Sequence, residues 1–189
     1  MKRGVSGTIS SSVSTMIGTW SETSASTFSG SVSYSPKFQK LFSANKYSSD
    51  GTTWTAYTNS PTANAKTYWS SSYGVAIAIA GSGETWYSID LDTWTQSGNL
   101  GNYSWSYILE FNGSIFAYGS NGSVAKSSDG ISWELRKVEQ SFQLGVQDVA
   151  TYSGKVVIAS DIYDGSTYIA GVYTSVDGVN FTELTTGLS

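Results

Sequence analysis

Carboxylate groups are the side chains that this sequence offers most plainly for catalysis. The chain contains 14 Asp and Glu residues but no His and no Cys. Two carboxylates acting as acid and base could hydrolyse a glycosidic bond. Without His or Cys, the chain cannot form Ser–His or Cys–His nucleophile pairs, nor metal sites with His or Cys ligands. The acidic residues that recur in a pattern look like turn residues, and the others are scattered without a shared motif.

The recurring acids belong to a sequence Ser-x-Asp-Gly-x-x-Trp, or a near relative of it, that occurs four times. The copies begin at Ser48, Ser88, Ser127 and Ser175, and their acidic residues are Asp50, Asp90, Asp129 and Asp177. Successive aspartates are 40, 39 and 48 residues apart. A period near forty that is carried by strand-forming residues predicts a β-propeller built blade by blade.

Each copy reads as a tight turn between two strands. The Asp carboxylate can accept hydrogen bonds from backbone N–H groups, and the Gly supplies a positive φ angle. The aromatic residue then begins the next strand and can cover the space beneath the turn. The second copy has Leu91 in place of Gly, and the fourth ends in Phe. The predicted structural turn residues are Ser48, Asp50, Gly51 and Trp54; Ser88, Asp90 and Trp94; Ser127, Asp129, Gly130 and Trp133; and Ser175, Asp177, Gly178 and Phe181.

These four copies resemble the Asp-box, or BNR-like, repeat of sialidase-type β-propellers, over roughly residues 40–185. The resemblance implies that each box joins the outer two strands of a blade. The chain differs from the family in one respect, because Asp and Gly adjoin here and are usually one residue apart there. Sialidase chemistry requires a cluster of arginines, and this chain has only Arg3 and Arg136. The resemblance therefore implies the fold and not the sialidase activity.

The segments between the boxes predict an all-β fold of four-stranded antiparallel blades. Three successive four-stranded units are expected within residues 67–96, 103–138 and 146–185, and the first repeat is less complete. We predict a small β-propeller with four blades; five blades, or an open array completed by a partner chain, are the alternatives. Residues 1–33 would form an N-terminal arm or a degenerate blade, and residues 34–189 the propeller repeats.

Aromatic residues outside the boxes are candidates for ligand binding. An exposed ring could stack on the apolar face of a sugar, although packing between blades is the preferred interpretation. A longer connection at residues 161–168 could present further aromatic side chains, and Asp161 and Asp164 within it are weak candidates for calcium ligands. The candidate binding residues are Trp69, Trp86, Trp105, Tyr163 and Tyr168. We predict no catalytic residue, no metal site and no cofactor.

The composition favours a particle-borne or extracellular protein. Charged residues make up 13% of the chain, and the net charge of −4 argues against a nucleic-acid surface. The longest apolar run, residues 75–80, is too short to cross a bilayer. The N-terminus lacks the apolar core of an export signal. Together these features predict a non-enzymatic viral or phage structural protein, namely a capsid decoration, a tail or fibre component or a host-surface adhesin.

That prediction includes partners and alternatives. The partners would be other virion proteins, copies of the same chain, or surface glycans, with neither nucleic acid nor membrane insertion. The expected location is the virion or the extracellular space. A secreted, lectin-like carbohydrate-binding propeller is the first alternative, and a divergent glycan hydrolase is the second.

Overall fold

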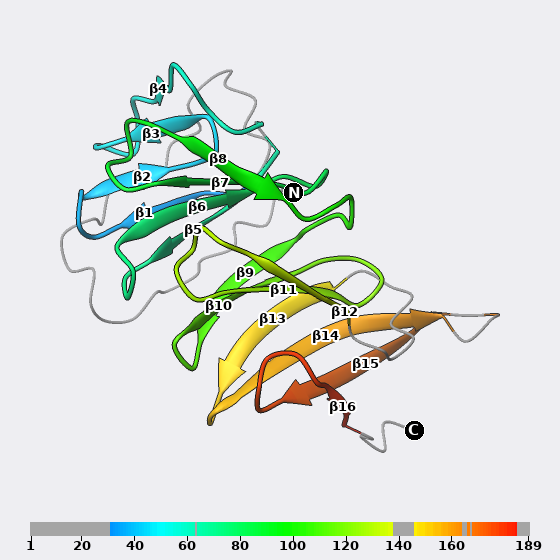
Figure 1. Cartoon of the computed structure of the whole chain (residues 1–189). Coiled ribbons are helices and arrows are strands. Elements are labelled where there is room, and N and C mark those ends of the chain that lie inside the picture. Colours follow the sequence, from blue (N-terminus) through cyan, green and yellow to red (C-terminus); the bar gives the residue numbers. More distant parts are fainter. Residues whose placement is uncertain (1–30, 63, 138–145, 164–165, 167, 185–189) are drawn as a thin grey trace, which may run out of the picture.

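The computed structural model describes residues 31–62, 64–137, 146–163, 166 and 168–184. Within these ranges the chain forms β-strands, turns and irregular connections and no helix, so they include no helix that could cross a membrane. The strands form four antiparallel sheets of four strands each, which we call blades 1 to 4 (Figure 1).

Each blade is a meander in which successive strands pair. Blade 1 contains β1 (Ser33–Ser35), β2 (Lys40–Phe42), β3 (Lys46–Ser48) and β4 (Thr55–Ala56). Blade 2 contains β5 (Lys66–Ser70), β6 (Val75–Ile79), β7 (Glu84–Ser88) and β8 (Thr95–Asn99). Blade 3 contains β9 (Tyr107–Phe111), β10 (Ser114–Tyr118), β11 (Ser123–Ser127) and β12 (Glu134–Lys137). Blade 4 contains β13 (Val146–Tyr152), β14 (Lys155–Tyr163), β15 (Tyr168–Ser175) and β16 (Thr182–Glu183).

This architecture confirms the predicted fold class, an all-β propeller of four antiparallel blades. Blade 1 has short strands, yet it is a complete four-stranded sheet. The proposed division of the chain at residue 33 stays a prediction, because residues 1–30 lie outside the described residues.

The blades pack face to face through apolar clusters between neighbouring sheets. Phe42 of blade 1 packs with Trp94 of blade 2, Ile77 of blade 2 with Ile115 of blade 3, and Phe116 of blade 3 with Val156 of blade 4, in three separate clusters. Burial of apolar surface on both faces explains why every residue of β6 and β10 is buried.

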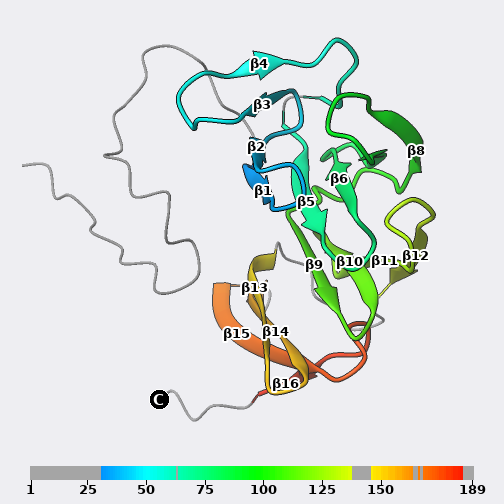
Figure 2. The ribbon, with the colours of Figure 1, turned by 90° about the vertical axis from the view of Figure 1, so that its left-hand side faces the viewer.

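The sheets follow one another in an arc whose ends are blades 1 and 4 (Figure 2). The first strands lie side by side in order, β1 beside β5, β5 beside β9, and β9 beside β13. Among the described residues, the buried apolar clusters join blades 1 and 2, 2 and 3, and 3 and 4, and none joins blade 4 to blade 1.

The turns between the third and fourth strands require a left-handed backbone conformation. The residue after each turn aspartate has a φ of 76° at Gly51, 61° at Leu91, 77° at Gly130 and 78° at Gly178. At Gly178 an added Cβ would lie 2.7 Å from the Phe116 ring of blade 3. The glycine therefore provides both the turn conformation and the close approach of two blades. Leu91 accepts the same conformation with its side chain fully buried.

Replacing Gly178 with Ala should destabilise the protein more than replacing Gly154 with Ala. Both residues have positive φ, 78° and 72°, but a Cβ at Gly154 meets no atom within 4 Å. Gly154→Ala should cost about 1 kcal/mol of unfolding free energy through backbone strain, and Gly178→Ala a further ~1–3 kcal/mol through overpacking against Phe116. Chemical denaturation of both variants measures the difference. Equal losses would show that blades 3 and 4 do not pack closely at this turn.

Candidate functional site

The four turn aspartates are engaged by their own turns. In the third turn, Oδ1 of Asp129 accepts hydrogen bonds from the N–H groups of Ile131 and Ser132, both at 2.7 Å, and from the Ser127 hydroxyl at 3.0 Å. The Gly130 N–H donates to the Ser127 hydroxyl at 2.8 Å. The other turns repeat this pattern around Asp50, Asp90 and Asp177.

Hydrogen bonding keeps these four carboxyl groups ionised. Backbone N–H groups, led by that of Thr53 for Asp50 and that of Thr93 for Asp90, lower the pKa of these carboxyls. Burial would raise the pKa of Asp129 and Asp177, but hydrogen bonds from the following N–H groups outweigh burial and lower it. These carboxylates hold turns and are therefore poorly suited to act as proton donors.

Two of the predicted stacking residues are buried between blades. Trp69 is 7% exposed and packs edge-on against Phe38, with ring centroids 5.7 Å apart. Trp105 is 2% exposed, packs edge-on against Tyr103, and donates from Nε1 to the Gly101 carbonyl at 3.0 Å. Neither ring presents a face to solvent, which corrects the expectation of sugar stacking there. The position of Trp105 beside a loop suggested an exposed ring. Packing against the neighbouring sheet buries the ring instead.

The other predicted binding residues are Trp86 of blade 2 and two tyrosines of blade 4, Tyr163 and Tyr168. Trp86 is half-buried and packs against the cluster between blades 1 and 2. Tyr163 and Tyr168 pair with each other at the end of the long β14–β15 hairpin, and their side chains lie outside the described part of the structure. Asp164 also lies outside it. Among the described residues, no group of three or more acidic side chains is arranged to hold a metal ion.

Polar side chains gather where β9 and β13 begin and β14 ends. The Tyr107 hydroxyl donates to the Gln147 carbonyl, and the Gln147 amide donates from Nε2 to Oδ2 of Asp161 at 2.9 Å. Burial and, to a lesser degree, the charge of Asp148 raise the pKa of Tyr107. We call Tyr107, Gln147, Asp148 and Asp161 the rim group. It combines two carboxylates, an amide and a phenol.

A β-bulge positions the rim group. The pairing of β13 with β14 shifts register between Val146 and Asp148, so that Gln147 is an extra residue without a partner. A bulge reorients the side chain of such a residue, and Gln147 reaches the carboxylate of Asp161 on the neighbouring strand. Gln147 and Asp148 are both exposed. The sequence carried no turn or periodicity signal for this irregularity, so the rim group was not predicted.

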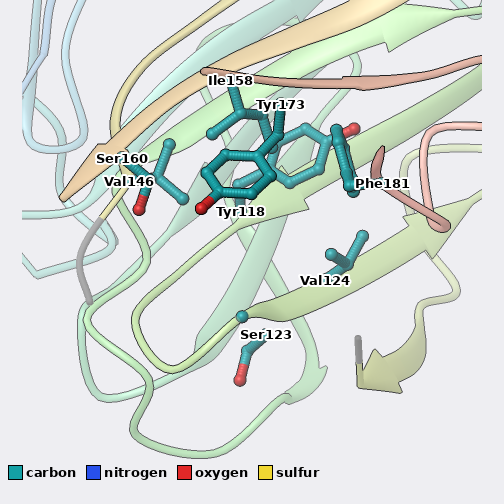
Figure 3. Close-up of a pocket in the computed structure, with 9 residues that line it drawn as sticks. Tyr118, Ser123, Val124, Val146, Ile158, Ser160, Tyr173 and Phe181 are labelled. Carbon is teal, nitrogen blue, oxygen red and sulfur yellow. The ribbon is translucent and has the colours of Figure 1, made fainter. Parts of the chain in front are cut away.

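An apolar pocket lies between blades 3 and 4 (Figure 3). Its cavity volume is about 20 Å³, which is room for roughly one water molecule, and it opens to solvent. Val146 and Ser160 line it and directly precede Gln147 and Asp161 in the chain, and Asp161 lies on the opposite face of β14 from Ser160 because successive strand residues point to opposite faces. Its other lining residues are mainly aromatic and aliphatic: Tyr118, Gly122, Ser123, Val124, Ile158, Tyr173 and Phe181. An apolar pocket next to polar groups is a common arrangement for a binding site.

A second polar contact lies at the other end of the inner strands. The Ser70 hydroxyl donates to Oε2 of Glu110 at 2.7 Å across blades 2 and 3. Burial, followed by the charge of Glu110, raises the pKa of the nearby Tyr68. Neither Ser70 nor Glu110 lines the apolar pocket between blades 3 and 4, so the rim group is the stronger candidate site.

Comparison with known proteins gives a structural likeness alone. No protein-family model matches the sequence, and no curated protein matches it. An ancestral GH74 enzyme superposes on 86% of this chain with a TM-score of 0.60 and 15% sequence identity. The chain spans 23% of the length of that enzyme. This likeness supports the propeller fold.

Other solved structures superpose less well. One is a family 117 glycoside hydrolase from the marine bacterium Zobellia galactanivorans, with a TM-score of 0.44, 16% identity, and coverage of 76% of this chain and 54% of the other. Another represents the GH130 family, which contains glycoside hydrolases that target beta-1,2 mannosidic linkages in Candida mannan. Its TM-score is 0.44, with 15% identity over 77% of this chain and 60% of the other.

These comparisons correct the functional expectation. The prediction of a non-enzymatic phage or viral structural protein is wrong, because the structure that superposes with a TM-score of 0.60 is that of an enzyme, the ancestral GH74 enzyme. The prediction that the chain is not an enzyme is wrong for the same reason. It rested on the absence of His and of an arginine cluster, which excludes sialidase chemistry. Hydrolysis by two carboxylates needs neither.

Replacing Asp129 with Ala should destabilise the fold. The N–H groups of Ile131 and Ser132 would lose their acceptor, at a cost of about 1–3 kcal/mol of unfolding free energy. Thermal denaturation of the variant and the wild type measures the loss. The folded variant should keep any binding activity that the wild type has. Loss of ligand binding at an unchanged melting temperature would instead identify the turn as part of a functional site.

Stability should fall at acidic pH because of the same aspartates. Their folded-state pKa values are lowered relative to an unfolded value near ~3.9. Their contribution is therefore complete above pH ~4 and is lost as the pH falls through the folded values. Melting temperatures measured between pH 7 and pH 2 should decrease below pH ~4, and less steeply in Asp129→Ala. An identical decrease in the variant would contradict this origin of the acid sensitivity.

Proposed function

We propose that this chain acts on glycans, as a divergent glycoside hydrolase of the propeller type, with the rim group as its active site. The observation that carries the proposal is the hydrogen-bonded series from Tyr107 through Gln147 to Asp161, with the carboxylate of Asp148 close enough to raise the pKa of Tyr107. Glycoside hydrolysis needs two carboxylates near the scissile bond. The absence of His and Cys from the chain is no obstacle to that chemistry.

The rim group offers each of the interactions that a sugar requires. Carboxylates and the amide can exchange hydrogen bonds with sugar hydroxyls. The Gln147 amide orients the Asp161 carboxylate through its hydrogen bond. The apolar side chains of the pocket can contact the apolar face of a sugar ring. The propeller enzymes that superpose on the chain add support at the level of fold.

Carbohydrate binding without hydrolysis is the second candidate function. The apolar pocket favours it, because its exposed side chains can contact a sugar ring whether or not the two carboxylates act on the sugar. In that case Gln147 and Asp161 would serve as hydrogen-bonding residues. We also propose that the four turns are of the Asp-box type, which is supported by the repeated hydrogen bonds around Asp129 and its three counterparts.

Hydrolysis can be tested by measuring the reducing ends released from a panel of neutral polysaccharides, including mannan and β-glucans. The wild type should release them, and Asp148→Asn and Asp161→Asn should each reduce the rate at least about 100-fold, because each removes one carboxylate of the pair. Glu134→Gln is the matched control, since Glu134 is an exposed carboxylate paired with Arg136 on an outer strand.

Retention on immobilised polysaccharide distinguishes the two candidate functions. Binding without release of reducing ends, abolished by Gln147→Ala, would contradict hydrolysis and support the lectin-like function. Neither release nor retention across the panel would contradict both. Equal loss of activity in Glu134→Gln and Asp161→Asn would show that the rim group is not the active site.

A further inference from the structure

One face of blade 4 belongs to no buried apolar cluster among the described residues. The middle strand β14 alternates between the two faces of the sheet. Val156 and Ile158 point toward blade 3 and are 0% and 6% exposed. Val157 and Ala159 alternate with them in the sequence, lie on the opposite face, and are half-buried. We call this opposite face of blade 4 the free face.

Strand register shows that the free face corresponds to a face that is buried in blade 3. Phe116 pairs with Lys126, and Tyr118 pairs with Val124, on the face of blade 3 that packs against blade 4. The serines Ser127 and Ser175 begin equivalent turns, and counting back from them aligns Phe116 with Val157 and Tyr118 with Ala159. The same alignment matches Val124 with Val172, which pairs with Ala159.

A large aromatic residue of the free face is mostly exposed to solvent. Phe111 pairs with Ser114 beside the first hairpin of blade 3 and is 7% exposed in the cluster with blade 4. Its counterpart in blade 4 is Tyr152, which pairs with Lys155 and is 77% exposed. Leu184 continues the free face beside Val172 and is 44% exposed. Blade 4 therefore presents apolar residues at the positions that blade 3 uses to bind its neighbour.

Blade 1 carries a matching surface at the other end of the arc. Blade 2 turns Trp69 and Ala76 toward blade 1, where both are buried. Register aligns Tyr34 with Trp69 and Leu41 with Ala76, because Leu41 pairs with Ser48 and Ala76 with Ser88. Tyr34 is 40% exposed, and Val32, two residues earlier on the same face, is 50% exposed. Exposed large apolar residues therefore occur at the outer face of each terminal blade.

We propose that the free face of blade 4 binds blade 1 of a second copy of this chain. The contact would continue the interface that already joins the four blades, with the same strand positions and the same alternation of faces. With two copies, blade 4 of each would meet blade 1 of the other, so that two equivalent contacts close the assembly. Closed two-fold symmetry is the commonest arrangement of identical subunits.

The proposed interface places the second copy next to the rim group. Asp148 pairs with Ala159, and Asp161 follows two residues after Ala159 on the same strand face. Both carboxylates therefore lie at the border of the free face. Blade 1 of the partner copy would form the other wall of the candidate active site.

Light scattering coupled to size-exclusion chromatography tests the proposal on the full chain. The subunit mass is 20.2 kDa, and the molar mass measured for the wild type should be twice that value. Tyr152→Lys and Tyr34→Lys should each raise the dimer dissociation constant at least about tenfold, because each places a charge in an apolar contact. Tyr152 is mostly exposed in the single chain, so its substitution should leave the melting temperature of the monomer unchanged.

Val176→Lys is the matched control, because Val176 is 66% exposed at the tip of a turn rather than on the free face. It should leave the dimer intact. A mixture of Tyr152→Lys and Tyr34→Lys chains should recover dimers through the one undamaged contact. A wild type that elutes as a monomer overturns the proposal, as does a dimer that survives Tyr152→Lys. Loss of the dimer on deletion of residues 1–30, together with its survival in Tyr34→Lys, would assign the free face to that segment instead.

Discussion

Burial of both faces of each middle strand is the constraint on which the rest of this structure depends. A single four-stranded sheet of this size has no interior, so its apolar residues become buried only when another sheet covers them. β6 and β10 satisfy this requirement on both sides, with Ile77 and Ile115 meeting in one cluster and Phe116 facing the next. The blades are therefore interdependent, and the position of every loop follows from how one sheet lies on its neighbour.

The repeated turns serve this packing as much as they reverse the chain. The turns of blades 2, 3 and 4 place a residue with positive φ, namely Leu91, Gly130 and Gly178, at the point where two blades approach. In every turn the aspartate satisfies backbone N–H groups that would otherwise lack an acceptor. Because Asp129 and its counterparts are occupied in this way, the carboxylates that remain for chemistry lie elsewhere. Those of the rim group lie at the opposite ends of the strands, beside a bulge and a pocket.

The sequence was sufficient for the parts of the molecule that repeat. The spacing of Asp50, Asp90, Asp129 and Asp177 predicted the blades, because each copy encodes the same local turn. It was insufficient where the structure departs from the repeat. The bulge at Gln147 and the burial of Trp105 depend on contacts between sheets that local patterns do not encode. The functional prediction failed for a related reason. Amino-acid composition describes the chain as a whole, whereas the proposed hydrolysis would depend on two particular carboxylates.

The arc of blades also determines how the molecule comes apart. In a linear series each unit is stabilised by its nearest neighbours, so internal units have two stabilising contacts and terminal units have one. Blade 4 contacts blade 3 alone among the described sheets, whereas blades 2 and 3 each have two neighbours. In the single chain, local unfolding should therefore begin at the ends of the series and proceed inward. In evolution, the same linearity allows whole units to be gained or lost at the ends without rebuilding the middle.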